Sequence, residues 1–162
     1  MDDALAFGGG RLEAADCSAD VVLLSRKHFR SIWISDFHLG TVRCKAESLL
    51  DFLRNHSAEN LFLVGDVIDG WNVGPGWCWT AAQTAVVEEL WAWRRRGSRM
   101  IFLPGNHDEF STEMVHTLFG AVECHDEFVH RTEAGRKMLV THGHQFEGSM
   151  HAARWMSLIG SL

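Results

Sequence analysis

Three short apolar runs, each followed at once by a cluster of glycine and polar residues, constrain the fold of this chain most. The runs cover residues 31–35, 61–64 and 100–103, and the polar clusters begin at residues 36, 65 and 104. Short apolar runs that end at turn residues are typical of strands buried in a sheet. The pattern therefore predicts three core strands with polar groups at the end of each.

Two segments of helical periodicity separate these strands. They extend over about 44–56 and about 80–96. One side of each carries the apolar residues: Leu49, Leu50, Phe52 and Leu53 in the first, and Ala85, Val86, Leu90 and Trp93 in the second. A hairpin is predicted for 127–131 and 137–141, around a turn at 133–135. The alternation of strands and helices predicts an α/β fold, with helices flanking a layered, mostly parallel β-sheet core.

The first two polar clusters contain acidic residues at spacings that suit a metal ion. In open α/β sheets, ligands bind outside the carboxyl ends of the strands, where these clusters lie. Asp36 and His38 are one residue apart, so in an extended segment their side chains project to the same side. Asp66 and Asp69 form GDxxD, and the carboxylate of Asp66 can bridge two cations. Either pair alone would also fit a turn or a helix cap.

The later clusters add amide and imidazole groups. Asn106, His107 and Asp108 form GNHD after the third run, and His142 and His144 follow the second arm of the hairpin. An asparagine offers a neutral oxygen ligand, and a histidine beside an aspartate suits a proton donor or a cation. Each cluster alone would also fit a turn or a solvated histidine. Four donor clusters in order, each at a strand end, favour a shared metal site instead.

The donor types indicate which metals to expect. Mixed carboxylate, amide and imidazole ligands suit divalent ions such as Mn²⁺, Fe²⁺ or Zn²⁺ better than a thiolate zinc site does. The four cysteines, at positions 17, 44, 78 and 124, form no CxxC pair, so a zinc ribbon or a redox motif has no support. The histidines at 28, 56, 116, 125, 130 and 151 have no comparable setting and are interpreted as surface or supporting residues.

With these motifs in place, the chain resembles the calcineurin-like metallophosphoesterase superfamily, whose motifs are DxH, GDxxD, GNHD and a later histidine motif. The likeness covers residues 31 to about 147. It implies two divalent metal ions, Mn²⁺ first and Fe²⁺ or Zn²⁺ as alternatives. By motif, the metal ligands would be Asp36, His38 and Asp66 for the first ion, and Asp66, Asn106 and His142 for the second, with Asp66 bridging. The catalytic residues would be His107, which contacts the phosphate, and Asp108, which orients it.

Within that superfamily the wording is similar to the UDP-2,3-diacylglucosamine pyrophosphohydrolase-like branch, which cleaves a lipid A precursor. The stretches that carry this likeness are ISDFHLGTVRCKAESLLDFL, LVGDVIDGW, GNHDEF and HGHQFEG. The branch has GNRD where this chain has GNHD, so a phosphodiesterase acting on another substrate is the alternative. Protein Ser/Thr phosphatases carry GDxVDRG, and this chain reads GDVIDGW, without the arginine.

The two ends of the sequence lead to further expectations. Residues 1–27 are glycine-rich and aperiodic, which predicts a flexible N-terminal tail before a metallophosphoesterase domain at 28–162. The superfamily ends with a GHxH motif, and none follows His144, so we expect a domain that is incomplete at its C-terminus. This leaves a non-catalytic remnant or scaffold of the same fold as a second hypothesis.

Charge and hydropathy limit the partners. The net charge of -6 provides no basic excess for nucleic acid, so no nucleic-acid partner is expected. The resemblance implies a phosphorylated small molecule or a nucleotide-linked lipid as the substrate. No run reaches the roughly 20 apolar residues of a membrane span, and no signal peptide is recognisable. We therefore expect a cytoplasmic protein with at most a peripheral contact at the inner membrane. The sequence carries no indication of the oligomeric state.

Overall fold

The computed structural model describes residues 26–70, 74, 76–108, 112–120 and 122–146. Its centre is a sheet of four parallel strands in the order β1-β2-β3-β4. The strands are β1 (Lys27–Ile34), β2 (His56–Val64), β3 (Arg99–Leu103) and β4 (Glu123–Cys124). Helix α1 (Ala46–Asn55) connects β1 to β2, α2 (Ala81–Arg95) connects β2 to β3, and α3 (Thr112–Phe119) connects β3 to β4. The predicted α/β class is confirmed.

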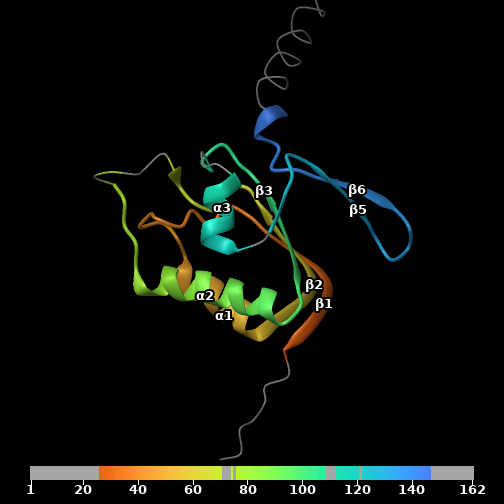
Figure 1. Ribbon diagram of the computed structural model, residues 1–162, viewed down its shortest axis with the longest axis horizontal. Coiled ribbons are helices and arrows are strands. Elements are labelled where there is room, and N and C mark those ends of the chain that lie inside the picture. Colours follow the sequence, from red (N-terminus) through yellow and green to blue (C-terminus); the bar gives the residue numbers. More distant parts are fainter. Residues whose placement is uncertain (1–25, 71–73, 75, 109–111, 121, 147–162) are drawn as a thin grey trace, which may run out of the picture.

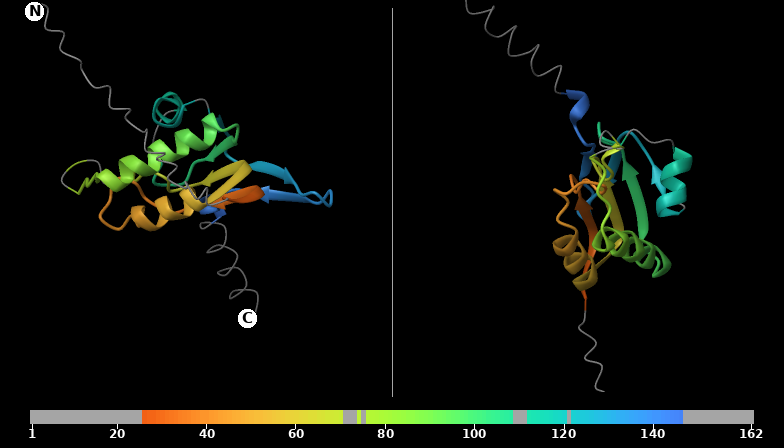
Figure 2. Two further views of the ribbon diagram at one scale, coloured as in Figure 1. Left: turned by 90° about the horizontal axis from the view of Figure 1, so that it is seen from below. Right: turned by 90° about the vertical axis from the view of Figure 1, so that its left-hand side faces the viewer.

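A two-stranded antiparallel hairpin follows the sheet. It consists of β5 (Phe128–Arg131) and β6 (Lys137–Val140), as the sequence predicted. A short 3-10 helix, His144–Phe146, comes next. The hairpin extends away from α1 and α2, which lie side by side (Figure 1). Two further views show the same arrangement (Figure 2).

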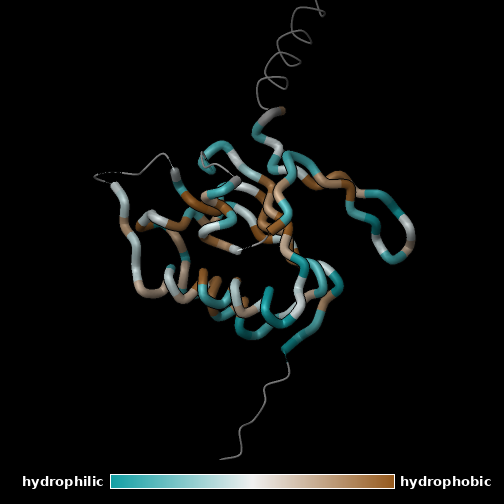
Figure 3. The backbone as a smooth tube through the Cα atoms, in the orientation of Figure 1, coloured by the Kyte–Doolittle hydropathy of each residue, from teal (hydrophilic) through white to brown (hydrophobic). Residues whose placement is uncertain are grey.

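The sheet separates two apolar clusters because neighbouring residues of a strand point to opposite faces. Leu61, Leu63 and Phe102 lie on the helical side and belong to the larger cluster, together with Leu90 and Trp93 of α2. The smaller cluster, on the other side, contains Phe62, Ile101, Leu103 and Val140, so the hairpin contributes to it. Figure 3 shows that apolar residues concentrate in the central strands, whereas the tip of the hairpin is hydrophilic.

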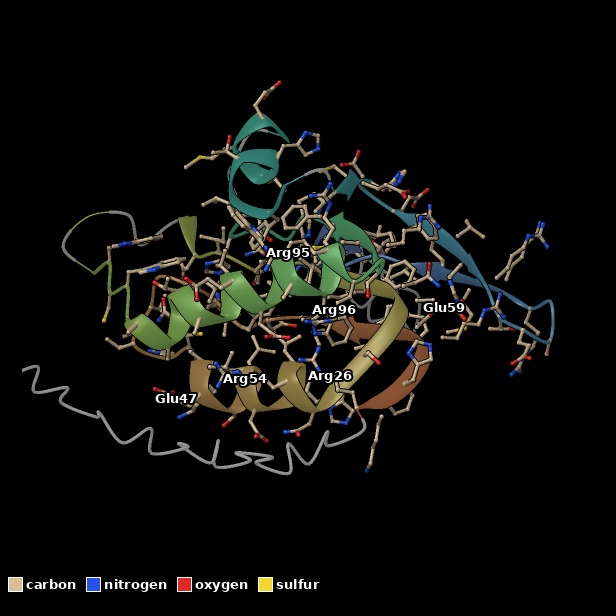
Figure 4. All side chains as sticks on the ribbon, turned by 60° about the horizontal axis from the view of Figure 1, so that its bottom comes forward. Arg26, Glu47, Arg54, Glu59, Arg95 and Arg96 are labelled. Atoms are coloured by element: carbon tan, nitrogen blue, oxygen red, sulfur yellow. The ribbon has the colours of Figure 1, made fainter. Side chains whose placement is uncertain are left out.

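The helical layer keeps its charged residues on its outer side. Figure 4 labels six charged residues, of which Glu47, Arg54 and Arg95 belong to α1 and α2. Two more of those labelled, Arg26 and Arg96, both pair with Glu89 of α2, at 3.3 and 2.8 Å. Beneath them the indole of Trp93 is fully buried, and its Nε1 donates to the carbonyl oxygen of Leu53 at 2.9 Å. This hydrogen bond joins α2 to α1 under an exposed polar surface.

Several sequence-based boundaries were wrong. Strand β1 begins at Lys27 rather than at Ser31, and β2 begins at His56, directly after α1. The sequence pattern also predicted the hairpin directly after the third strand, so the short elements α3 and β4 between them were not predicted. The tail was predicted for residues 1–27, of which 1–25 lie outside the described residues. The C-terminal residues 147–162 also lie outside them.

His130 was wrongly interpreted as a surface or supporting residue. Its ring is only 8% exposed and makes edge contacts with the rings of Trp33 and Phe62. Burial lowers the pKa of His130, with the nearby charge of Arg30 as a smaller cause.

Candidate metal centre

The loops after β1, β2 and β3 stay hydrogen-bonded to one another beyond the ends of the strands. The backbone N–H groups of Asp36, His38 and Leu39 donate to the carbonyl oxygens of Gly65, Asp66 and Val67, at 3.1, 2.9 and 2.8 Å. Gly65 in turn donates to Leu103, at 2.7 Å. The sheet pairing thus continues into the polar motifs, which brings DxH, GDxxD and GNHD together.

The backbone at this edge is strained. Asp36, His38 and Asp66 have φ angles of 56°, 45° and 52°, and they are the non-glycine residues with positive φ in the described part of the chain. Such a conformation costs on the order of 1–3 kcal/mol for each residue and clusters at functional sites. Aspartate and histidine enter this region more readily than most side chains do. The strain coincides with three predicted metal ligands.

Two glycines allow the close approach of these ligands. A Cβ atom on Gly65 would overlap the ring of His142, and one on Gly105 would overlap both the carboxylate and the backbone nitrogen of Asp66. The glycines that open the GD and GN motifs therefore have a steric role. Gly65 lets His142 approach the end of β2, and Gly105 lets Asp66 approach the loop after β3.

Two groups of potential metal ligands result, and both include Asp66. One is His38, Asp66 and His107, and the other is Asp36, Asp66 and His142, each with its ligand atoms within 4.8 Å of one another. The Oδ2 atom of Asp66 lies 3.7 Å from Nε2 of His38 and 3.8 Å from Nε2 of His142. Its Oδ1 atom accepts a hydrogen bond from the backbone N–H of His107, which fixes the carboxylate.

These distances fit residues that share a cation. The Nε2 atom of His142 lies 3.5 Å from Oδ1 of Asp36, and the Nε2 atom of His107 lies 4.0 Å from Oδ2 of Asp66. Both distances are too long for a good hydrogen bond. Ligands around an ion at roughly 2.1 Å would lie about 3.4 Å apart in a tetrahedral arrangement. The donor set therefore fits divalent metal ions.

The sequence of this chain matches a family model described as calcineurin-like phosphoesterase. The match covers residues 29–158, which is most of the 162 residues. The chain belongs to the calcineurin-like phosphoesterase family. Members of this family use divalent metal ions, in agreement with the two ligand groups around Asp66. The resemblance drawn from the four motifs is confirmed at the level of the family.

Among solved structures, this calcineurin-like phosphoesterase is similar to a protein of unknown function from Aquifex aeolicus. The two share 17% sequence identity with a TM-score of 0.47, and the aligned region covers 68% of this chain and 59% of the other. The chain thus spans less than two thirds of the length of that relative. The search among curated proteins found no match.

The grouping of ligands differs from the one that the family resemblance implies. That resemblance places Asp36 with His38 on one ion, whereas here His142 lies nearest Asp36, and His38 groups with His107. Asp66 is common to both groups, as a bridging ligand would be. Asn106 lies half-buried in the loop between Gly105 and His107, and its role as a ligand stays a prediction.

Asp69 was named in the GDxxD motif, but the sequence interpretation gave it no role at the site. It is 4% exposed, and its carboxylate lies 3.6 Å from Nδ1 of His38 and 3.3 Å from Nδ1 of His107. A carboxylate beside the second ring nitrogen orients a histidine and fixes its tautomer. The signal was present as the second aspartate of GDxxD. Its partners could not be found without the fold.

Asp108 has a different neighbourhood from the expected one. Its carboxylate accepts hydrogen bonds from the backbone N–H groups of Val67, Ile68 and Gly105, at 3.0, 2.8 and 2.9 Å. Burial raises the pKa of Asp108, although the three amides act in the opposite direction. Asp69 lies beside the ring of His107, and the expected role of Asp108 in orienting that ring stays a prediction. Asp108 instead ties the GNHD loop to the GDxxD loop.

His144 supports His142. The two Nδ1 atoms lie 3.2 Å apart, so one ring can donate to the other. Because the Nε2 atom of His142 faces Asp36 and Asp66, this contact engages the opposite side of the ring. Residues beside a ligand that hold its ring in this way usually contribute to metal affinity.

Two cavities adjoin the ligand groups and share His38. The larger, of about 440 Å³, is lined by His38, Asp69 and His107 together with Thr41, Arg43 and Gly76. The smaller, of about 280 Å³, is lined by Asp36 and His38 together with Arg43, Lys45, Ser48 and Leu49. A group held at the ligand cluster would therefore have space on two sides.

Proposed function

We propose that this calcineurin-like phosphoesterase is a binuclear, divalent-metal-dependent hydrolase of phosphoester or phosphoanhydride bonds. The observation that carries the proposal is the pair of ligand groups that share Asp66 at the carboxyl ends of β1, β2 and β3. Two bound divalent cations lower the pKa of a water molecule and neutralise charge on phosphate oxygens. Mn²⁺ is the metal we propose first, with Fe²⁺ and Zn²⁺ as alternatives.

The protein side chains would position the substrate around these ions. Asp66 is the carboxylate able to serve both ions, since its Oδ2 atom faces His38, His107 and His142. Although His107 belongs to one ligand group, we assign it to the substrate rather than to an ion, as the family resemblance implies, so that its Nε2 atom would donate a hydrogen bond to a phosphate oxygen or to the leaving group. Asp69, at 3.3 Å from Nδ1, would hold that ring in place.

For the substrate we propose a nucleotide-linked lipid diphosphate of the UDP-2,3-diacylglucosamine type. The four stretches of sequence similar to that branch support this choice, and the two cavities that meet at His38 suit a phosphorus with large substituents on both sides. The histidine of GNHD, where the branch has arginine, supports a different phosphodiester as the second candidate. A Mn²⁺-dependent assay that offers both substrates decides between them.

The proposed cell biology follows from such a substrate. No helix among the described residues is long and apolar enough to cross a membrane. We propose a cytoplasmic enzyme that meets its lipid substrate by peripheral contact with the inner membrane. Co-sedimentation with vesicles that contain the nucleotide-linked lipid tests this contact.

The test of the metal centre is the substitution Asp66→Ala. Removing the shared carboxylate should abolish hydrolysis and weaken the binding of both ions, measured by calorimetric titration with Mn²⁺. Asp51→Ala, at an exposed position of α1, is the control and should leave both readouts close to those of the unmodified protein. Mn²⁺-dependent hydrolysis that persists in Asp66→Ala would contradict the proposal.

A further inference from the structure

Arg43 lines both cavities beside the ligand cluster. In the part of the chain that the structure describes, its guanidinium group forms no ion pair. Three arginines elsewhere do form such pairs: Arg26 and Arg96 with Glu89, and Arg99 with Glu123. An arginine without an acidic partner beside metal ligands is available for an anionic group of a ligand.

The backbone that carries Arg43 is fixed relative to the metal ligands. Thr41 binds the carbonyl oxygen of His38 through both its backbone N–H and its hydroxyl, at 3.3 and 3.0 Å. The backbone N–H of Cys44 donates to the carbonyl oxygen of Thr41, at 3.4 Å. Arg43 therefore stands in the turn Thr41–Cys44, which follows directly on the turn from His38 to Thr41. These turns fix the backbone of Arg43 beside the site, while its side chain is exposed.

A buried side chain anchors this turn to α2. The side-chain carbonyl of Gln83 accepts from the backbone N–H of Gly40 at 2.8 Å, and its amide donates to the carbonyl oxygen of Thr41 at 3.0 Å. Gln83 is only 1% exposed. Because a fixed backbone leaves less freedom to lose when a ligand binds, only the side chain of Arg43 has to be ordered by a bound anion.

The chemistry of the site indicates which anion Arg43 would bind. A phosphoryl group at the ligand cluster would have the two cavities as space for its substituents, and Arg43 lines both of them. The planar guanidinium group matches the oxygens of a phosphate in a bidentate manner. Lys45 adds a second positive charge to the smaller cavity. A neighbouring phosphoryl group is therefore better suited to this place than an uncharged substituent.

We propose that Arg43 is a specificity-determining residue that binds the phosphoryl group next to the one that is hydrolysed. It makes the site selective for diphosphate diesters over esters with a single phosphate. This inference rests on the proposed function, because it takes the ligand cluster as the place of the reacting phosphoryl group.

The first experiment compares two substrates. The specificity ratio is kcat/KM for a nucleoside diphosphate sugar divided by kcat/KM for bis-p-nitrophenyl phosphate, both with Mn²⁺. Arg43→Gln should lower this ratio by about 10- to 100-fold, as the loss of a charged hydrogen bond does. Arg43→Lys should lie between this variant and the unmodified protein. The matched control is Arg54→Gln, at an exposed position of α1, and it should leave the ratio unchanged.

The second experiment measures binding and does not require turnover. UDP and UMP, which differ by one phosphoryl group, are titrated into the Mn²⁺-loaded protein. Arg43→Gln should remove most of the preference for UDP. If the ratio of substrates and the preference for UDP are both the same in Arg43→Gln as in the unmodified protein, the assignment of Arg43 is wrong. Failure of the proposed function would appear separately, as hydrolysis that survives Asp66→Ala.

Discussion

Gln83 provides a quantitative test of how the site is held. Its side chain is buried on α2 and makes two hydrogen bonds to the turn after His38, at Gly40 and Thr41. The substitution Gln83→Met keeps the length of the side chain and removes both bonds. Because methionine fills the space of an unbranched side chain, little cavity should form. The loss of stability then comes from the polar groups left behind.

Two losses add to the expected change in the free energy of unfolding. The N–H group of Gly40 would become a buried donor without a partner, which costs about 1–3 kcal/mol. The carbonyl oxygen of Thr41 keeps the N–H group of Cys44 at 3.4 Å, so its loss is closer to that of one ordinary hydrogen bond, about 1 kcal/mol. The sum is about 2–4 kcal/mol, a large part of the roughly 5–15 kcal/mol that stabilises a domain.

Urea unfolding with and without Mn²⁺ separates a general loss of stability from an effect on the site. Gln83→Met should unfold at lower urea and should also gain less stability from Mn²⁺, since a looser turn holds His38 less well. Leu90→Ala, a fully buried position on the same helix, should cost a comparable amount of about 2–5 kcal/mol but keep the full gain from Mn²⁺. A change in stability of less than about 0.5 kcal/mol in Gln83→Met would contradict the anchoring role of Gln83. An equal gain in stability from Mn²⁺ in both variants would contradict its effect on His38.

Two further substitutions probe the hairpin and the metal centre. Burial lowers the pKa of His130, so the folded state favours the neutral ring. The stability that this preference contributes should be complete above the ordinary pKa of about 6.5 and should be lost as the pH falls to the lowered pKa. His130→Gln should reduce that rise in stability, measured by urea unfolding between about pH 5 and 7. His125→Gln, at an exposed position, is the control and should leave the rise unchanged. If the slope of stability against pH is also unchanged in His130→Gln, His130 does not have this role. Gly65→Ala should weaken Mn²⁺ binding because its Cβ overlaps the ring of His142, with φ at 69°. Gly135→Ala is the control, because Gly135 has φ at 76° but open space around it, and this substitution should cost only the backbone strain of about 1–2 kcal/mol. Equal Mn²⁺ affinities in the two variants would contradict the steric role of Gly65.

The sequence predicted those parts of the fold in which one physical signal dominates. Strands β2 and β3 are recognisable because both of their faces are buried, so their central residues are all apolar. The hairpin was predictable from a glycine turn between two short strands. The position of the metal centre followed from polar motifs at the ends of such strands. These features depend on local sequence and on one rule of sheet geometry.

Other features were beyond the reach of local patterns. Helix α3 and strand β4 are short, and β4 has two residues, so neither produces a periodicity that can be read in isolation. Gln83 lies among the buried residues of α2, where a polar side chain weakens the apolar pattern, and its partners are 43 and 42 positions away.

The site shows the same limit. Asp108 follows His107 in sequence, yet its carboxylate bonds amides that are 41 and 40 residues away. Asp69, from a different loop, lies beside the ring instead. The motifs therefore indicated which residues lie close together at the sheet edge, but not which of them contact one another. Those contacts depend on how three loops meet at the edge of the sheet.

The left-handed backbone at Asp36, His38 and Asp66 has a consequence for protein engineering. A designer who grafts only the ligand side chains onto another α/β scaffold would place them on backbone of ordinary φ. The side chains would then leave their strands in the wrong direction. A host scaffold would have to reproduce three strained turns, at a combined cost of roughly 3–9 kcal/mol, before any metal is added. Transplanting this centre is therefore a problem of loop design more than of ligand choice.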